Sequence, residues 1–101
     1  MNQEESVEGY VIDIACLRKY PQRDLLEKVR QHSKQCSLMG HCIESGFALV
    51  NESGRTSLLD TAATPLVINA VSGSTADAGI RLCAKRKLVD EEMHTFSVSE
   101  I

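Results

Sequence analysis

The order of β-rich and helical segments along the 101-residue chain is the feature that most restricts its fold. Short segments rich in β-branched and aromatic residues are separated by turn residues, which is typical of strands. The predicted strands cover residues 7–17, 47–51, 56–60, 80–88 and 94–101. One helical segment follows the first strand, and a shorter one lies between the third and the fourth. The pattern therefore predicts a mainly β chain with two helical additions.

Residues 22–39 are predicted to form the first helix, because apolar residues recur there at intervals of three or four. This apolar stripe consists of Leu25, Val29, His32, Cys36 and Met39. Basic residues occupy the other face. Gly40 is expected to break or bend the helix, and Gly46 to provide a C-terminal cap.

The second helix is expected to begin at Thr64-Pro65, with threonine as the N-cap and proline in the first helical position. Gly73 is expected to end it. A helix between the third and fourth of five short strands is the chain order of an OB-type barrel. We therefore predict a partly open, five-stranded OB-type barrel with a helical Cys/His insertion after the first strand. A mixed α+β sheet without closure is the alternative.

Composition indicates a single globular domain over residues 1–101, with the polar residues 1–6 disordered. The net charge is −3, and the four aromatic residues include no tryptophan. An acidic chain with so few aromatics is not expected to bind nucleic acid. No apolar run is long enough for a membrane span, and no signal sequence is recognised. Homo-oligomerisation is possible.

Three cysteines and two histidines fall within 27 residues, which predicts a shared site. In a helix, His32 and Cys36 would lie one turn apart on one face, as paired metal ligands do. Cys42 could return past Gly40, and Cys16 ends the strand that leads to the helix. Cys16, His32, Cys36 and Cys42 would complete a tetrahedral Cys₃His zinc site. A softer ion such as Cu(I) is the second choice.

Each of these residues also has an ordinary structural interpretation. His32 could be a hydrogen-bonded core histidine, Cys36 a buried apolar residue, and Cys42 a disulfide partner. His41 would replace His32 if His32 pointed away, and Met39 is expected to fill the core. Cys83 alternates with two basic residues, which favours a partly exposed thiol outside the site.

Two basic segments and a lone acid complete the set of candidates. Residues 18–34 carry six basic and two acidic residues, and residues 81–87 carry four basic and no acidic ones. If the two met, they could bind an anion, although a solvated surface is the expected role. Asp13 could orient a histidine. No G-x-S-x-G, H-E-x-x-H, P-loop or paired-carboxylate motif is present, so a non-enzyme is the favoured expectation.

The motif G-Y-V-I-D-I-A-C, followed by H-S-K-Q-C-S-L-M-G-H-C and a Gly-aromatic strand start, resembles a group of small bacterial OB-fold-like proteins. Their pattern is G-x-V-x-D-x-x-C, then H-x3-C-x5-C. The resemblance implies a shared fold and a shared site rather than an activity. It also implies a periplasmic or exported location, whereas a full-length chain without a signal would be cytoplasmic.

Three function classes remain open from the sequence. The first is a small non-enzymatic module that binds a metal or cofactor through the Cys/His site. The second is a protein- or ligand-interaction domain whose cysteines are structural. The third is a thiol redox protein.

Overall fold

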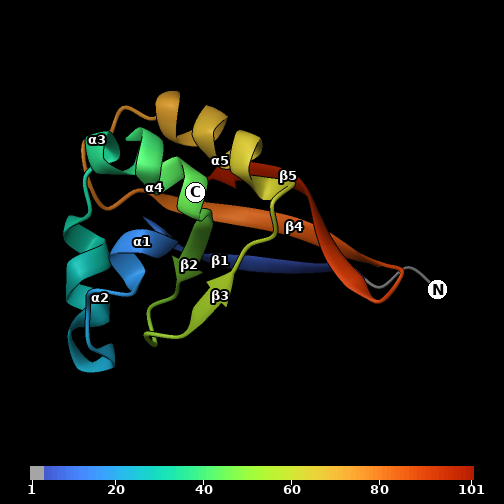
Figure 1. The fold of residues 1–101 in the computed structure, drawn as a ribbon, viewed down its shortest axis with the longest axis horizontal. Helices are drawn as coiled ribbons and strands as arrows, with labels where there is room; N and C mark the ends of the chain where they lie inside the picture. The colour runs from blue at the N-terminus through green and yellow to red at the C-terminus, as the bar shows by residue number, and fades with distance from the viewer. Residues whose placement is uncertain (1–3) are drawn as a thin grey trace.

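A five-stranded antiparallel sheet forms the centre of the computed structural model, which describes residues 4–101 (Figure 1). Its strands lie in the order β3-β2-β1-β4-β5. They are β1 (Glu4–Asp13), β2 (Phe47–Val50), β3 (Thr56–Leu58), β4 (Arg81–Val89) and β5 (Glu92–Glu100). The central strand β1 pairs with β2 through its last residues and with β4 through its first ones. The predicted mainly β character is confirmed.

The helices lie at one end of the sheet and over one face of it (Figure 1). They are α1 (Ile14–Leu17), α2 (Gln22–Gln31), α3 (Lys34–Ser37), α4 (Gly40–Ser45) and α5 (Ala63–Ser72). The insertion between β1 and β2 thus contains four short helices. Gly46 ends the last of them with a φ of 87°, which confirms the predicted cap.

The prediction of a single helix over residues 22–39 is wrong. Helix α2 ends at Gln31, and His32 is already extended. The Ser33 side chain then accepts a hydrogen bond from the Cys36 N–H and begins α3. A serine N-cap competes with continuation of the preceding helix. His32 and Cys36 therefore do not share a helical stripe.

The first strand is also shorter than predicted at its C-terminal end. It stops at Asp13, whose side chain accepts a hydrogen bond from the Cys16 N–H and caps α1. Cys16 therefore lies in a helical turn instead of at a strand end. At the other end, Glu4 and Glu5 pair with Lys87 and Arg86 of β4, so disorder does not extend over residues 4–6. Residues 1–3 lie outside the described part of the chain.

Apolar side chains form two clusters, one on each face of the sheet. Val11, Leu49 and Leu82 pack beneath α5. Ile12 and Val50 point the other way, toward Leu25 and Val29 of α2. The alternation of side chains along a strand explains this split. At its C-terminal end β1 is covered on both faces, and Asp13 lies between the two helical layers.

The later elements largely follow the predicted pattern. Helix α5 begins at Ala63 after Ala62 as the N-cap, so the prediction that Thr64 caps it is wrong, whereas Gly73 ends it as expected. Gly54 has a φ of 78° in the loop between β2 and β3. Strict alternation along the strand predicted for residues 94–101 would turn Phe96 inward with Val98, but Phe96 is 46% exposed. Lys85 pairs with Ser97 and Arg86 with Thr95, so Phe96 is the extra residue of a β-bulge that interrupts the alternation.

Side chains connect β3 and the residue two positions after it to β4 and β5, and no β3–β5 ladder closes the sheet among residues 4–101. Asp60, just after β3, accepts hydrogen bonds from the N–H and hydroxyl of Thr95 on β5. The Arg86 guanidinium donates to the Leu58 carbonyl. The sheet is therefore open along its backbone and joined by polar contacts. No helix in the described part of the chain is long and apolar enough to cross a membrane.

Replacing Asp60 with asparagine is expected to lower the free energy of unfolding by about 1–3 kcal/mol, since Thr95 loses a charged acceptor. Partial burial opposes ionisation of Asp60, but the Thr95 hydrogen bonds outweigh it and lower the pKa of Asp60 below 3.8. This stabilisation is complete above the unfolded-state pKa and is lost as the pH falls through the folded-state pKa. Denaturant unfolding at pH 7 and at acid pH measures it, and an equal loss at both would contradict the assignment.

Candidate metal centre

Asp13 is a fully buried carboxylate at the junction of β1 and α1. Its Oδ2 atom accepts the Cys16 N–H at 2.9 Å. Its Oδ1 atom lies 2.9 Å from His32 Nε2, which donates to it. A buried carboxylate needs such partners, because an unpaired one carries a large desolvation cost. These two hydrogen bonds hold α1 and the end of α2 in fixed positions relative to β1.

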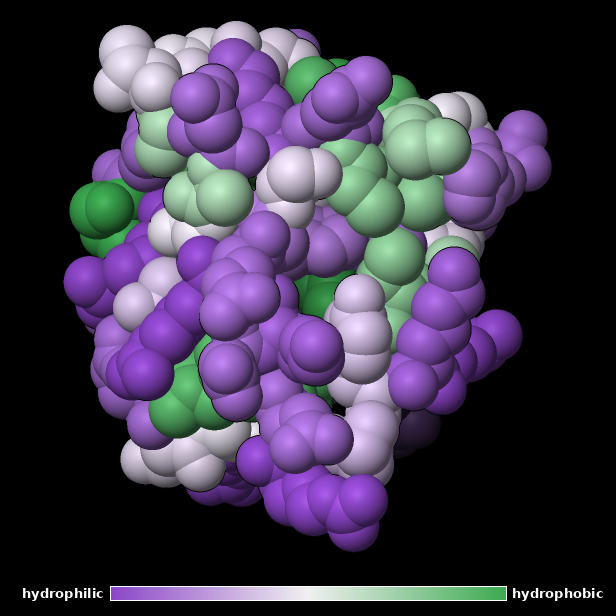
Figure 2. All heavy atoms as spheres, turned by 90° about the vertical axis from the view of Figure 1, so that its left-hand side faces the viewer, coloured by the Kyte–Doolittle hydropathy of each residue, from purple (hydrophilic) through white to green (hydrophobic). Residues whose placement is uncertain are grey.

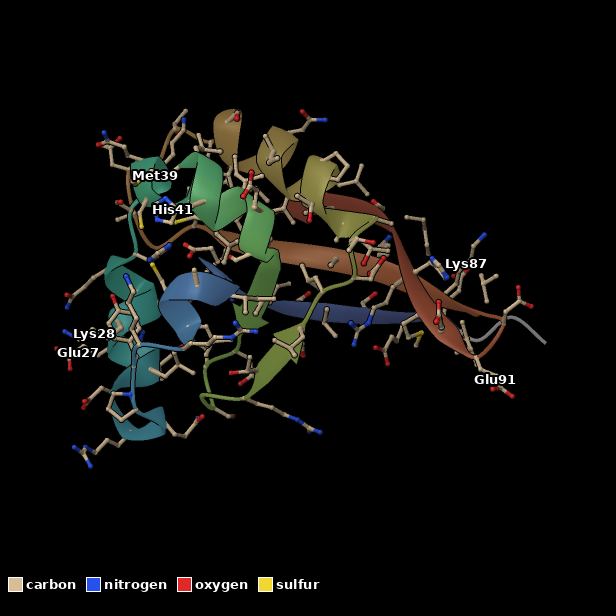
Figure 3. All side chains as sticks on the ribbon, viewed as in Figure 1. Glu27, Lys28, Met39, His41, Lys87 and Glu91 are labelled. Atoms are coloured by element: carbon tan, nitrogen blue, oxygen red, sulfur yellow. The ribbon has the colours of Figure 1, made fainter. Side chains whose placement is uncertain are left out.

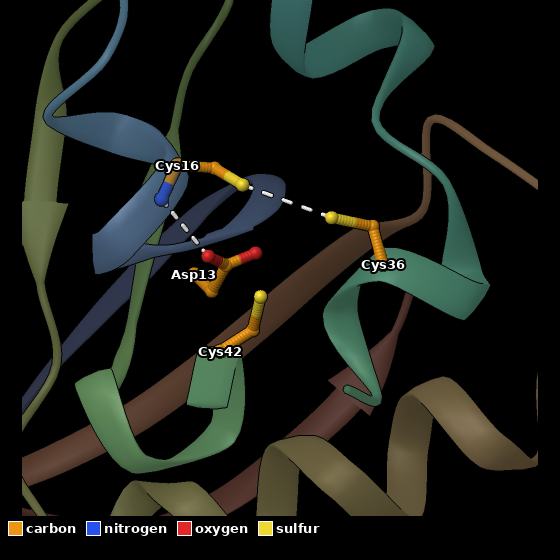
Figure 4. Close-up of side chains that lie close together, drawn as sticks. All are labelled: Asp13, Cys16, Cys36 and Cys42. Atoms are coloured by element: carbon orange, nitrogen blue, oxygen red, sulfur yellow. Dashed lines mark hydrogen bonds between the residues drawn. The ribbon is translucent and has the colours of Figure 1, made fainter. Parts of the chain in front are cut away.

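Three cysteines converge on this carboxylate from three different helices (Figure 4). Cys16, Cys36 and Cys42 are each the third residue of a short helix, namely α1, α3 and α4. Side chains in a helix lean toward its N-terminus, so each thiol points back toward the start of its own helix. The three thiols meet beside the Asp13 carboxylate.

The geometry of the group is compact enough for one ion. The Sγ atoms of Cys16 and Cys36 lie 3.7 Å apart. One ligand atom from each of Asp13, Cys16, Cys36 and Cys42 lies within 4.8 Å of all the others. Cys16 and Cys42 are buried, whereas Cys36 is partly exposed. The site therefore has a closed interior and one side nearer to solvent.

The charge states of these groups favour protonated thiols next to an ionised carboxylate. Burial, with the Asp13 carboxylate nearby, raises the pKa of Cys16 to about 12 and that of Cys42 to about 11. Burial also opposes ionisation of Asp13, but hydrogen bonds from the Cys16 N–H and from the neighbouring thiols outweigh it and lower its pKa. A cation placed among them would reverse this balance by displacing the thiol protons.

The structure brings together three of the four residues predicted as ligands. Cys16, Cys36 and Cys42 belong to the group, and His32 reaches it through its hydrogen bond to Asp13. Sequence reasoning gave Asp13 only the role of orienting a histidine. The signal that could have identified it is the D-x-x-C spacing, in which an aspartate N-cap accepts from a residue three positions later.

The other sulfur and imidazole groups lie elsewhere. Met39 is 46% exposed, and His41 is exposed beside it at the junction of α3 and α4 (Figure 3). Cys83 lies on β4 between Glu8 of β1 and Ser99 of β5. The described residues thus contain one cluster with metal-ligating chemistry, formed by Asp13 and the three cysteines.

Comparisons with protein-family models, with curated proteins and with solved structures give no match to this chain. The interpretation of the cluster therefore depends on its geometry and chemistry.

Replacing Asp13 with alanine is expected to destabilise the metal-free protein by about 3 kcal/mol, because it removes a helix cap and a charged hydrogen bond. Asp24→Ala is the matched control: Asp24 is 46% exposed and only 4.0 Å from Arg23. Its effect should be below about 0.5 kcal/mol. Urea unfolding measures both variants, and equal effects would show that Asp13 does not organise the site.

Proposed function

We propose that this protein binds one metal ion through the thiolates of Cys16, Cys36 and Cys42. The observation that carries the proposal is the distance of 3.7 Å between Cys16 Sγ and Cys36 Sγ. In a tetrahedral zinc site, with Zn–S bonds of about 2.3 Å, two sulfur ligands lie about 3.8 Å apart. Zinc is therefore the first choice of ion, and Cu(I) is the second because it also prefers thiolates.

Asp13 is the proposed fourth ligand, in place of the His32 expected from the sequence. Its carboxylate is already within the group, and carboxylate oxygen is an ordinary zinc ligand. The Asp13–His32 hydrogen bond supports this assignment, because metal-bound carboxylates are commonly held by such outer partners. A Cys₃His site requires His32 to leave Asp13 and bind the ion directly.

The proposed role is non-enzymatic, that of a small metal-binding module. A thiol redox function would require Cys36 to exchange a disulfide with an accessible, ionised partner, whereas its neighbours Cys16 and Cys42 are buried and have raised pKa values. A structural disulfide would pair two of the three cysteines and leave the third in the same buried group. An ion uses all three.

The same proposal includes an OB-type architecture for the sheet. The strand order β3-β2-β1-β4-β5 supports it, together with the Asp60–Thr95 hydrogen bonds that link the end of β3 to β5. We also propose that this protein is related to the small bacterial OB-fold-like proteins and that it is exported, as that relationship implies. The sequence motif alone supports this part of the proposal.

The reduced protein is expected to bind one equivalent of zinc and to melt at a higher temperature when loaded. Cys36→Ser should weaken zinc binding at least about a hundredfold, since it removes a thiolate ligand. Titration against a competing chelator measures the affinity. With cobalt as a probe, intense thiolate-to-metal charge-transfer absorption should appear in wild type and weaken in the variant.

Cys83→Ser is the matched control, because Cys83 is the one cysteine outside the cluster. It should bind zinc as wild type does. Two results would contradict a metal site: no stoichiometric ion in the reduced protein, or equal affinities for the two serine variants. Replacing His32 with glutamine distinguishes the two candidates for the fourth ligand, Asp13 and His32. It should preserve the cobalt spectrum if Asp13 binds the ion, and change it if His32 does.

A further inference from the structure

A surface pocket of about 290 Å³ lies beside one corner of the metal group. It is formed by the chain preceding α2, by α2, by the connection from α2 to α3, and by α3, namely by Tyr20, Lys28, Gln31, His32, Ser33 and Cys36. The face of the molecule that carries α2 and α3 is mostly hydrophilic (Figure 2). Of the cluster residues, Cys36 alone lines this pocket.

The remaining ligands are shielded from solvent. Asp13 is fully buried, Cys42 is 1% exposed and Cys16 is 7% exposed. Asp13 is held by hydrogen bonds with the Cys16 N–H and the His32 ring. Cys36 is partly exposed and belongs to a helix of four residues. An ion exchanging with solution would therefore meet Cys36 first.

The residues lining the pocket favour a negatively charged ligand. Lys28 carries a positive charge, its Nζ atom lying 5.8 Å from the centroid of the Tyr20 ring. None of the six lining residues is acidic. Gln31 and Ser33 add neutral hydrogen-bonding groups. A small anion would thus find a cation and polar partners next to the exposed sulfur ligand.

We propose that the metal ion enters and leaves this site through the pocket, in exchange with a small thiol that carries carboxylate groups. This inference rests on the proposed metal function. The incoming thiol loses its proton and its sulfur binds the ion, while the bond between the ion and Cys36 Sγ breaks. Cys36 takes up a proton, and no atom changes its oxidation state. Lys28 attracts the carboxylates of the thiol.

The experiment measures zinc transfer from the loaded protein to a chromophoric chelator as reduced glutathione is added. The transfer rate should rise with glutathione concentration and should rise less with cysteamine, a thiol without carboxylates. Lys28→Glu should reduce the glutathione-dependent rate roughly fivefold, as expected for reversal of one charge near the path of an anion. Its equilibrium affinity for zinc should equal that of wild type.

Arg23→Glu is the matched control, since Arg23 also lies on α2, has an 85% exposed side chain and does not line the pocket. Equal rates for the two charge reversals, or a rate independent of glutathione, would overturn the exchange route while leaving zinc binding intact. A wild-type protein that binds no zinc at all would overturn the metal function itself.

A second measurement tests access without relying on the lysine variant. In the metal-free protein with Cys83→Ser, iodoacetamide should modify Cys36 before Cys16 and Cys42, because Cys36 alone lines the pocket. Peptide mass mapping identifies the modified residue. Faster modification of Cys16 or Cys42 would place the access route elsewhere and overturn the proposal.

Discussion

The buried carboxylate of Asp13 is the constraint on which the arrangement of this protein depends. It ends β1, begins α1 through the Cys16 N–H, and holds the end of α2 through His32. A carboxylate with 0% exposure must be satisfied by such donors or pay a large desolvation cost. The consequence is that a strand and two helices are fixed at one point, which is also where the cysteines meet.

Strand β1 links this point to the rest of the fold. Val11 packs beneath α5, whereas Ile12 contacts the layer formed by α1, α2 and α4. The last residues of β1 are therefore covered from both faces. Asp13 directly follows these residues, so its side chain is shielded from water. That environment strengthens its electrostatic effect on the neighbouring thiols.

The cluster has an inner and an outer part with different chemical properties. Cys16, Cys42 and Asp13 form the inner part, where burial keeps water away. Cys36 forms the outer part, beside a pocket with one positive charge and no acid. In the proposed metal function, such an arrangement combines firm positioning of most ligands with access at one of them. Tight binding and exchange of the proposed ion are then compatible, because they depend on different residues.

Local patterns in the sequence determined the strands, the capping glycines and the choice of Cys16, Cys36 and Cys42, because turn residues and cysteine spacing act over short distances. Tertiary structure decided which group joins those cysteines. The predicted His32–Cys36 stripe failed when Ser33 capped a new helix, and Phe96 turned outward at a bulge set by pairing with β4. Asp13 joined the thiols because burial on both faces of β1 forced its carboxylate to find partners from segments distant in sequence. Periodicity carries no information about such long-range burial.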